Sequence, residues 1–203
     1  MKTPADVAAA VDAGADAIGF VLAPSSRQVP AALVHRLADG VPVSTYAVTV
    51  DLTPDEVEPL LSATGVTGLQ PHGAHAVEAA TVADGLGLDV LFPVRVDGPV
   101  RPGEAGLGFR PLLDTAGTLH GGSGHTFDWD LIDHDGAEFV LAGGLGPDNV
   151  AAAIADALLS TQMTLNRGRL IGLWFDRAIA KRTGKAGHIR RIDLRVRARV
   201  EDS

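Results

Sequence analysis

The chain of 203 residues contains no cysteine, so neither a disulfide nor a thiolate metal site can form within it. No apolar run reaches the length of a transmembrane helix, and the chain does not open with a basic and then apolar signal segment. We therefore expect a cytoplasmic protein without a membrane partner. The seven histidines show neither the i, i+4 spacing nor the clustering with acids that a metal site needs, so no metal is expected.

The balance of charge reverses near residue 160. Up to Leu159 the chain holds 6 Lys and Arg against 21 Asp and Glu, and from Ser160 to Ser203 it holds 11 against 4. The net charge thus changes from −15 to +7, which accounts for the overall value of −8. Basic blocks can bind nucleic acid. This tail has few aromatics and no recognised nucleic-acid motif, so we expect no nucleic-acid partner and treat 1–159 and 160–203 as separate units.

Short apolar segments that are poor in charge recur along the chain, as is typical of a parallel sheet buried on both faces. These predicted strands are Ala17–Leu22, Val43–Val50, Gly68–His72, Asp89–Val94, Phe109–Asp114 and Phe139–Ala142. Helix-start signals lie between them: Pro4–Asp12 has a first-turn proline, and Thr53 to Glu56 form a capping box. The alternation predicts an α/β fold, and both a doubly wound sheet and a barrel fit it.

The stretch Leu112–Trp129, LLDTAGTLHGGSGHTFDW, combines a strand end, a glycine-rich loop and an acid between two aromatics. Four glycines allow the loop to fold tightly over a ligand. Asp128 lies between Phe127 and Trp129, and a carboxylate beside apolar rings loses solvation, which favours the protonated form that a general acid needs. The alternative is a surface loop in which Asp128 caps the next helix.

A second glycine-rich turn follows the next predicted strand. Glu138–Val150 reads EFVLAGGLGPDNV, so Gly143 and Gly144 lie between a buried strand and a helix start. Backbone N–H groups exposed in such a turn hold anions and phosphates. The alternative is a simple turn without a ligand.

Together these segments resemble phosphoribosylanthranilate isomerases. The family pattern of LLD, a GGSGKTFDW-like run and GGLNPENV is matched here by LLDT, GGSGHTFDW and LAGGLGPDNV in the same order. Upstream, DVAAAVDAGADAIGFVLAPSSRQV, VTVDLTPDEV and LQPHG also resemble family segments. Asp51 replaces the usual Asn, and Pro71 the usual Leu. The resemblance covers roughly Lys2 to Ala157 and implies a (β/α)8 TIM barrel with its active site on the loops after the strands.

The resemblance also implies the reaction and the site. The family converts N-(5-phosphoribosyl)anthranilate, in tryptophan biosynthesis, by an Amadori rearrangement without metal or organic cofactor. Asp128 corresponds to the general acid, and Arg27 to the arginine for the anthranilate carboxylate, which a guanidinium suits. Gly143 and Gly144 correspond to the phosphate-side glycines. His72 is either structural or a substrate contact, and Asp114 either lies near the substrate or supports the glycine loop. The partner is a small phosphorylated substrate, and the chain is a monomer or homodimer.

Both ends depart from the family pattern. The family's first strand carries a Lys-Ile-Cys-Gly-like motif whose cysteine is the general base, and its eighth strand completes the phosphate cradle; neither is found here. We expect an incomplete barrel whose first and eighth strands are missing or replaced, with open edges where they would pair. A helical period predicts a helix over Arg169–Arg182. Two hypotheses follow: an isomerase of doubtful activity, or a non-catalytic truncated or frameshifted remnant that at most binds a sugar phosphate. The related histidine-pathway isomerase fits less well, because no half-barrel duplication is found.

Overall fold

The computed structural model describes residues 1–12, 14–115, 126–133, 137–145, 149, 169–174 and 188–190. Strands and helices alternate along the first two thirds of the chain. In order they are α1 (Pro4–Asp12), β1 (Ala17–Val21), α2 (Ala31–Ala38), β2 (Ser44–Val50), α3 (Pro54–Thr64), β3 (Gly68–His72), α4 (Ala76–Gly85), β4 (Asp89–Val96), α5 (Pro102–Ala105), β5 (Arg110–Thr115), the 3-10 helix η1 (Trp129–Leu131), β6 (Glu138–Leu141), β7 (Arg169–Trp174) and β8 (His188–Arg190).

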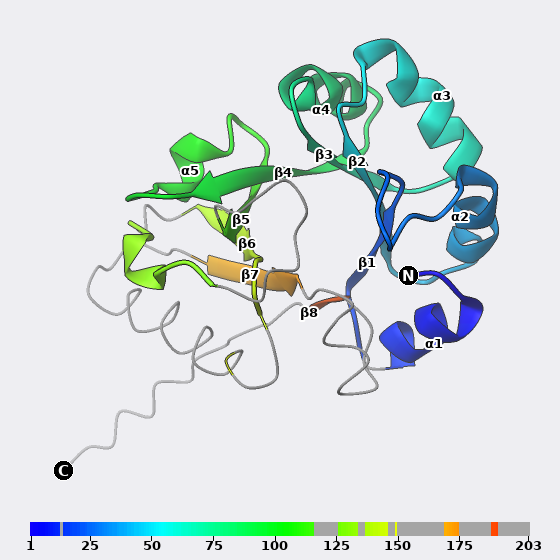
Figure 1. Ribbon diagram of the computed structural model, residues 1–203, viewed down its shortest axis with the longest axis horizontal. Coiled ribbons are helices and arrows are strands. Elements are labelled where there is room, and N and C mark those ends of the chain that lie inside the picture. The colour runs from blue at the N-terminus through cyan, green and yellow to red at the C-terminus, as the bar shows by residue number, and fades with distance from the viewer. Residues whose placement is uncertain are drawn as a thin grey trace.

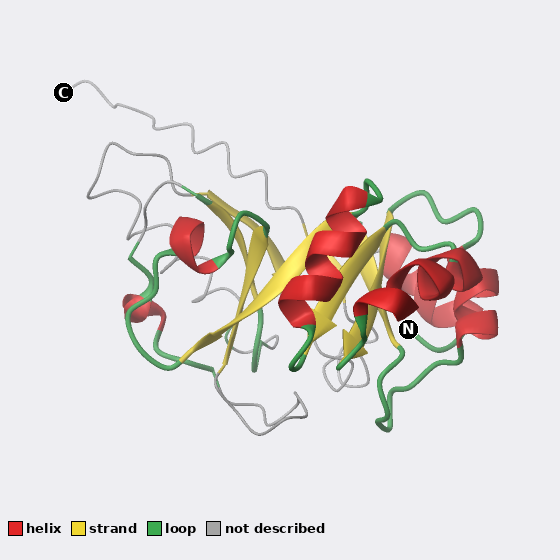
Figure 2. Ribbon diagram, turned by 90° about the horizontal axis from the view of Figure 1, so that it is seen from above, coloured by secondary structure: helices red, strands yellow, loops and turns green. Residues whose placement is uncertain are grey.

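The six predicted strands correspond to β1–β6, which pair in chain order and run parallel. Helices α1–α4 lie along the outside of β1–β4, as in a TIM-type barrel (Figures 1 and 2). Helix α3 begins as its sequence predicts, since the backbone N–H of Thr53 donates to the Glu56 carboxylate at 3.0 Å. The prediction of an α/β barrel is therefore confirmed.

The strand edges that we expected to be open are paired. Strand β7 lies parallel to β6, and the short β8 runs antiparallel to both β7 and β1, so the described strands form a closed ring. The helix predicted over Arg169–Arg182 is wrong for its first six residues, which form β7. A short apolar run such as Leu170–Trp174 suits a strand as well as a helix, and here pairing with β6 outweighs the helical spacing. The remainder, 175–182, lies outside the described residues.

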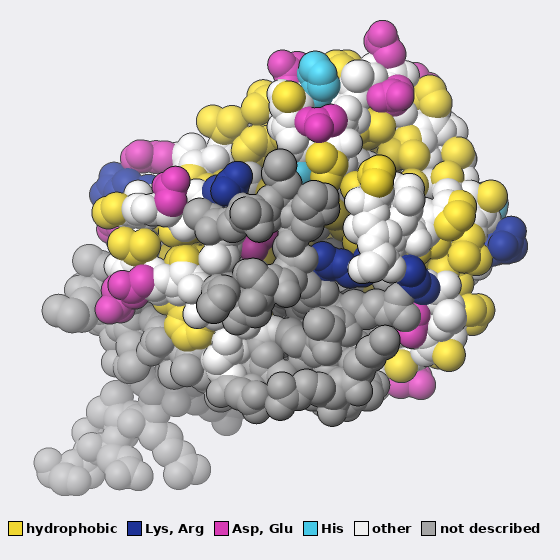
Figure 3. Space-filling view, in the orientation of Figure 1, with side chains coloured by type: hydrophobic (Ala, Val, Ile, Leu, Met, Phe, Trp, Pro, Cys, Tyr) yellow, Lys and Arg dark blue, Asp and Glu magenta, His cyan; other side chains and the backbone are white. Residues whose placement is uncertain are grey.

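Both faces of the sheet are buried, and strand alternation decides which side chains lie on each. The outer face packs against the helices; for example, Leu69 of β3 belongs to the same buried cluster as Val57 of α3 and Ala79 of α4. A separate buried cluster fills the inside of the ring, with members from β1, β2, β4, β5 and the end of β6. Its members are Ala17, Tyr46, Leu91, Leu112, Val140 and Ala142. On the face shown in Figure 3, hydrophobic side chains are interspersed with acidic and a few basic ones.

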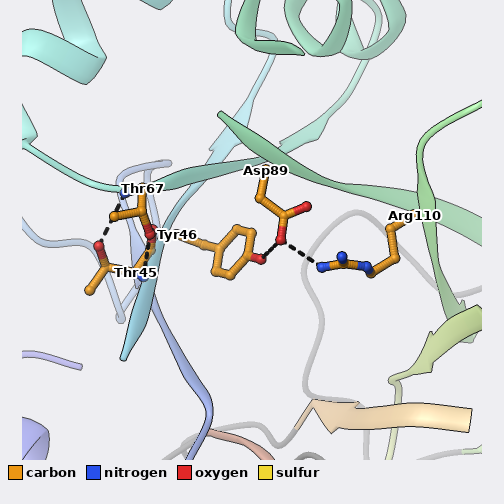
Figure 4. A network of polar contacts seen from close by, with 5 residues as sticks. All are labelled: Thr45, Tyr46, Thr67, Asp89 and Arg110. Carbon is orange, nitrogen blue, oxygen red and sulfur yellow. Dashed lines mark hydrogen bonds and ion pairs between the residues drawn. The ribbon is translucent and has the colours of Figure 1, made fainter. Parts of the chain in front are cut away.

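A polar network lies inside the ring at the ends where β4 and β5 begin (Figure 4). Asp89 accepts hydrogen bonds from the Tyr46 hydroxyl and, at 2.6 Å, from Arg110. Burial raises the pKa of Tyr46 well above its usual range, and the Asp89 carboxylate adds to that shift. The network therefore connects β2, β4 and β5 at the end of the barrel opposite the carboxyl ends of the strands.

Candidate active site

The carboxyl ends of β1–β6 meet at one end of the barrel, which we call the mouth. Because the strands are parallel, the predicted site residues that end or follow a strand lie at this end. Arg27 follows β1, His72 ends β3, Asp114 is the last residue but one of β5, and Gly143 follows β6. The family-type placement of these backbone positions thus arises directly from the strand order.

Asp114 and Gly143 are direct neighbours at the mouth. Leu113 pairs with Leu141, and the backbone N–H of Ala142 donates to Leu113 O at 2.7 Å. A Cβ built on Gly143 would lie 2.6 Å from Asp114 Oδ1. Gly143 also has φ +81°, a left-handed conformation that side chains other than hydrogen disfavour. Both the close approach and the backbone angle therefore require glycine here.

The turn after β6 is further held by Asn149, whose side-chain amide donates to Gly144 O at 3.0 Å. Gly144, like Gly143, has a positive φ, of 60°. The predicted phosphate turn is thus an ordered, glycine-dependent loop beside the Asp114 carboxylate. The residues between Leu145 and Asn149 lie outside the described part.

Arg27 lies in the loop between β1 and α2 and is half-buried. Its backbone N–H donates to Ser25 Oγ at 3.1 Å, and Gln28 donates from its side chain to Leu22 O at 3.0 Å. The first contact lies within the loop, and the second ties the loop back to the end of β1. Arg27 is therefore carried on a loop at the mouth, as the resemblance implies.

Asp128 is exposed, which differs from the desolvated setting that its aromatic neighbours suggest. Phe127 is buried and, with Trp129, packs in a cluster that includes Leu113 and Leu141 from the outer face of β5 and β6. The rings are therefore turned toward the core, and the carboxylate between them is left in contact with solvent. Its Oδ1 accepts from the backbone N–H of Asp130 at 3.1 Å, so Asp128 caps η1, as the alternative reading proposed. Its role as an acid stays a prediction.

The short segment that carries Asp128 is anchored to the loop after β4. Val100 forms a parallel bridge with Ile132, with backbone hydrogen bonds of 2.8 Å from Val100 to Leu131 O and from Asp133 to Val100 O. The Arg101 guanidinium adds a 2.7 Å contact to Asp133. The preceding loop, 116–125, which holds the four glycines and His125, lies outside the described residues.

His72 lies beside a residue that the sequence reasoning did not single out. Gln70 is buried on the same strand, and its Nε2 lies 2.8 Å from His72 Nε2. Burial lowers the pKa of His72 to about 4, so the imidazole is neutral near pH 7. The sequence did hold a signal for Gln70, because a polar residue two positions before His72 in an otherwise apolar strand must share its face.

The described residues contain no cluster of three or more His, Asp or Glu that could hold a metal ion. Among the helices of that same part, none has the length and apolar character needed to cross a membrane. The predicted site residues at the mouth are a carboxylate, an arginine, an imidazole and a glycine turn.

The fold and the mouth together define a TIM-type barrel with a glycine turn after β6. The family model of N-(5'-phosphoribosyl)anthranilate isomerase matches residues 1–165, and the chain belongs to that family. The resemblance seen in the sequence is thus confirmed. A second model, tail completion protein gp17, matches residues 139–201, less than half of the chain.

Individual relatives agree with this assignment. The N-(5'-phosphoribosyl)anthranilate isomerase of Listeria monocytogenes serotype 4a is 40% identical over 161 residues, covering 76% of this chain and 79% of its own. The crystal structure of the Thermus thermophilus phosphoribosyl anthranilate isomerase has a TM-score of 0.66 at 29% identity, covering 77% of this chain and 80% of its own. A further isomerase structure, in complex with reduced 1-(o-carboxyphenylamino)-1-deoxyribulose 5-phosphate, has a TM-score of 0.59 at 26% identity, covering 77% and 78%.

Proposed function

We propose that this chain acts on N-(5-phosphoribosyl)anthranilate and isomerises it to 1-(2-carboxyphenylamino)-1-deoxyribulose 5-phosphate in tryptophan biosynthesis. Family membership supports the substrate. The observation that carries the proposal is the mouth between β5 and β6, where the Asp114 carboxylate lies against the glycine turn at Gly143. The reaction is an aldose–ketose isomerisation, an intramolecular oxidation and reduction that needs no cofactor.

We assign the roles as the family resemblance implies. Asp128 donates a proton to the ribose ring oxygen, the bond from that oxygen to C1′ breaks, and the anthranilate nitrogen forms a double bond to C1′. A base then removes the C2′ proton, and the electron pair moves through C1′ to the nitrogen to give an enolamine. Protonation at C1′ and loss of the proton from the C2′ hydroxyl then yield the ketone. Asp128 is exposed, so it can exchange protons with solvent between turnovers.

The remaining groups bind the substrate in this proposal. Arg27 pairs with the anthranilate carboxylate, Gly143 and Gly144 hold the phosphate, and His72 and Asp114 contact the phosphoribosyl part. A guanidinium and a left-handed glycine turn suit the two anionic ends of the molecule. The half-buried position of Arg27 and the ordered turn after β6 support this division.

The base is the weak point of the reaction in this chain. The resemblance assigns the base to a cysteine, and the 203 residues of this chain include no cysteine. A general base contributes about 10²–10⁴-fold to the rate of such reactions. We therefore propose that the chain binds the substrate and turns it over slowly. The alternative, a non-catalytic remnant, rests on the same missing thiol.

The proposal also covers the basic C-terminal segment, which supplies two strands of the ring. We propose that 160–203 is a basic segment outside the family pattern, that its β7 takes the place of the family's eighth strand, and that β8 takes the place of the first. The parallel pairing of β7 with β6 and the position of β8 beside β1 support this. A monomer or homodimer in the cytoplasm remains the proposed state.

Two experiments test the function. The purified chain is assayed for loss of N-(5-phosphoribosyl)anthranilate fluorescence, beside Asp128→Asn and a cysteine-containing relative. We expect turnover about 10²–10⁴-fold below the relative and lower still in the variant. If the parent chain turned over the substrate no faster than Asp128→Asn, the result would favour the hypothesis of a non-catalytic remnant. Robust growth of a tryptophan auxotroph lacking this isomerase, when supplied with these 203 residues, would show that the account of the base is wrong.

A further inference from the structure

Gln70 and His72 project from the same face of β3, toward the inside of the barrel. Gly68, two residues earlier, lies against the ring of Tyr46, which belongs to the interior cluster. Leu69, between Gly68 and Gln70, packs outward against the helices. By strand alternation, Gln70 and His72 share the inner face with Gly68, and His72 is the one nearest the mouth.

The orientation of the Gln70 amide in the structure sets the direction of donation in this contact. The distance between Gln70 Nε2 and His72 Nε2 is 2.8 Å, and an amide nitrogen can only donate. His72 Nε2 must therefore accept, which requires a neutral ring with its proton on Nδ1. Within the described part of the chain, Gln70 Oε1 is buried without a hydrogen-bond partner. Buried polar groups usually have such a partner.

The backbone at His72 is also held by hydrogen bonds. Asp51, at the end of β2, donates from its N–H to His72 O at 2.8 Å, and its Oδ1 accepts from the N–H of Ala74 at 2.6 Å. Asp51 does so with φ 53°, a left-handed conformation that is uncommon for a residue other than glycine. Strained backbone of this kind is found where the surroundings fix one arrangement.

We infer that Gln70 is a positioning residue that holds His72 as the neutral Nδ1–H tautomer, so that His72 offers one uncharged N–H donor to an oxygen of the bound phosphoribosyl compound. A neutral donor does not compete with Arg27 for the carboxylate, and it suits a ribosyl oxygen. This inference rests on the proposed function for the identity of the ligand. The tautomer itself depends only on the Gln70–His72 contact.

The tautomer is measured first, by long-range ¹H–¹⁵N correlation on histidine-labelled protein near pH 7.5, with the His72 signals assigned from their loss in His72→Asn. We expect the parent chain to show a protonated Nδ1 and a bare Nε2. In Gln70→Glu the carboxylate can only accept, so Nε2 of His72 should carry a proton. In Gln70→Met the two tautomers should mix. A parent chain with its proton on Nε2, or a Gln70→Met pattern identical to the parent, would overturn the inference.

Binding is measured second, by fluorescence titration with reduced 1-(o-carboxyphenylamino)-1-deoxyribulose 5-phosphate. A neutral hydrogen bond contributes about 0.5–1.5 kcal/mol, so Gln70→Met should weaken binding by roughly 3- to 10-fold. Thr49→Val is the matched control, since Thr49 is also buried with an unpaired hydroxyl but lies on β2 and on the outer face. Equal weakening in both variants would mean a general structural effect and would overturn the inference. Absence of binding by the parent chain would reject the proposed function, and the tautomer pattern would then decide the role of Gln70 alone.

Discussion

The ring of Tyr46 on β2 occupies the space that a side chain on Gly68 of β3 would need. A Cβ built on Gly68 would lie 2.6 Å from Tyr46 Cδ1 and 2.7 Å from the backbone oxygen of Asp89. Tyr46 can therefore cross over β3 and reach Asp89 on β4 only because β3 has glycine at this point (Figure 4). A single small residue thus permits a polar connection across three strands.

Gly68→Ala should destabilise the fold, because neither the aromatic ring nor the backbone oxygen can move away freely. Overpacking of a buried site costs about 1–3 kcal/mol, and we expect a loss of free energy of unfolding in that range, measured by urea denaturation. Gly85→Ala is the control, since a Cβ there meets nothing within 4 Å and Gly85 closes helix α4. Equal stability of Gly68→Ala and the parent would contradict this account of the Tyr46 ring.

Tyr46→Phe tests the hydroxyl separately from the ring. The change removes the donor to Asp89 but leaves the Arg110 contact of 2.6 Å in place. A hydrogen bond of this kind contributes about 0.5–1.5 kcal/mol, and more when the acceptor is charged. We expect a loss near the upper end of that range by urea denaturation. The result would count against the network if Tyr46→Phe matched the parent while Gly68→Ala did not.

His72 should make stability depend on pH. In the folded chain its pKa is lowered to about 4, against an ordinary value of 6.5. Between pH 6.5 and 4, His72 binds a proton in the unfolded chain but not in the folded chain, so protonation favours unfolding. The stability that the neutral His72 contributes is therefore complete above pH 6.5 and is lost as the pH falls toward 4. The loss is on the order of 3 kcal/mol in full. We expect His72→Asn to lose less stability than the parent between pH 7 and 4.5 in urea titrations, and parallel losses would contradict this.

Asp51 should tolerate asparagine but not alanine. Asn keeps an oxygen that can accept from the Ala74 N–H and readily adopts the left-handed conformation, whereas Ala offers no acceptor and is strained at φ 53°. We expect Asp51→Asn to unfold within about 0.5 kcal/mol of the parent and Asp51→Ala to lose about 1–3 kcal/mol. Similar losses in the two variants would show that the side-chain oxygen does not hold this loop.

The sequence was sufficient for most of the barrel but not for its closure. Strands such as β3 and β5 were predicted within a residue or two of their observed ends, because their apolar runs are bounded by clear turn signals. The segment beginning at Arg169 was predicted as a helix, since its apolar residues fit a helical period. Its strand conformation depends on pairing with β6, a contact remote in sequence that local periodicity does not encode.

The sequence predicted which residues lie near the strand ends, but not how exposed each side chain is or what it contacts. The order of strands brings Asp114 beside Gly143. The sequence left open whether Asp128 is desolvated or an exposed cap, because two flanking aromatics indicate burial only if they pack around the acid, and here they pack beneath it. Gln70 was missed because its role depends on a contact with His72 rather than on its own spacing.

The most direct test of the account is the equilibrium titration of the intact chain with reduced 1-(o-carboxyphenylamino)-1-deoxyribulose 5-phosphate, followed by fluorescence. We predict saturable one-to-one binding that Arg27→Gln weakens by about 10- to 100-fold, since a hydrogen bond to a charged group contributes about 1.5–3 kcal/mol. Arg36→Gln, an exposed arginine in the last turn of the outer helix α2, should leave the affinity unchanged. Failure of the folded chain to bind, or equal affinity in parent and Arg27→Gln, would contradict the proposal that this mouth takes a phosphoribosylated anthranilate.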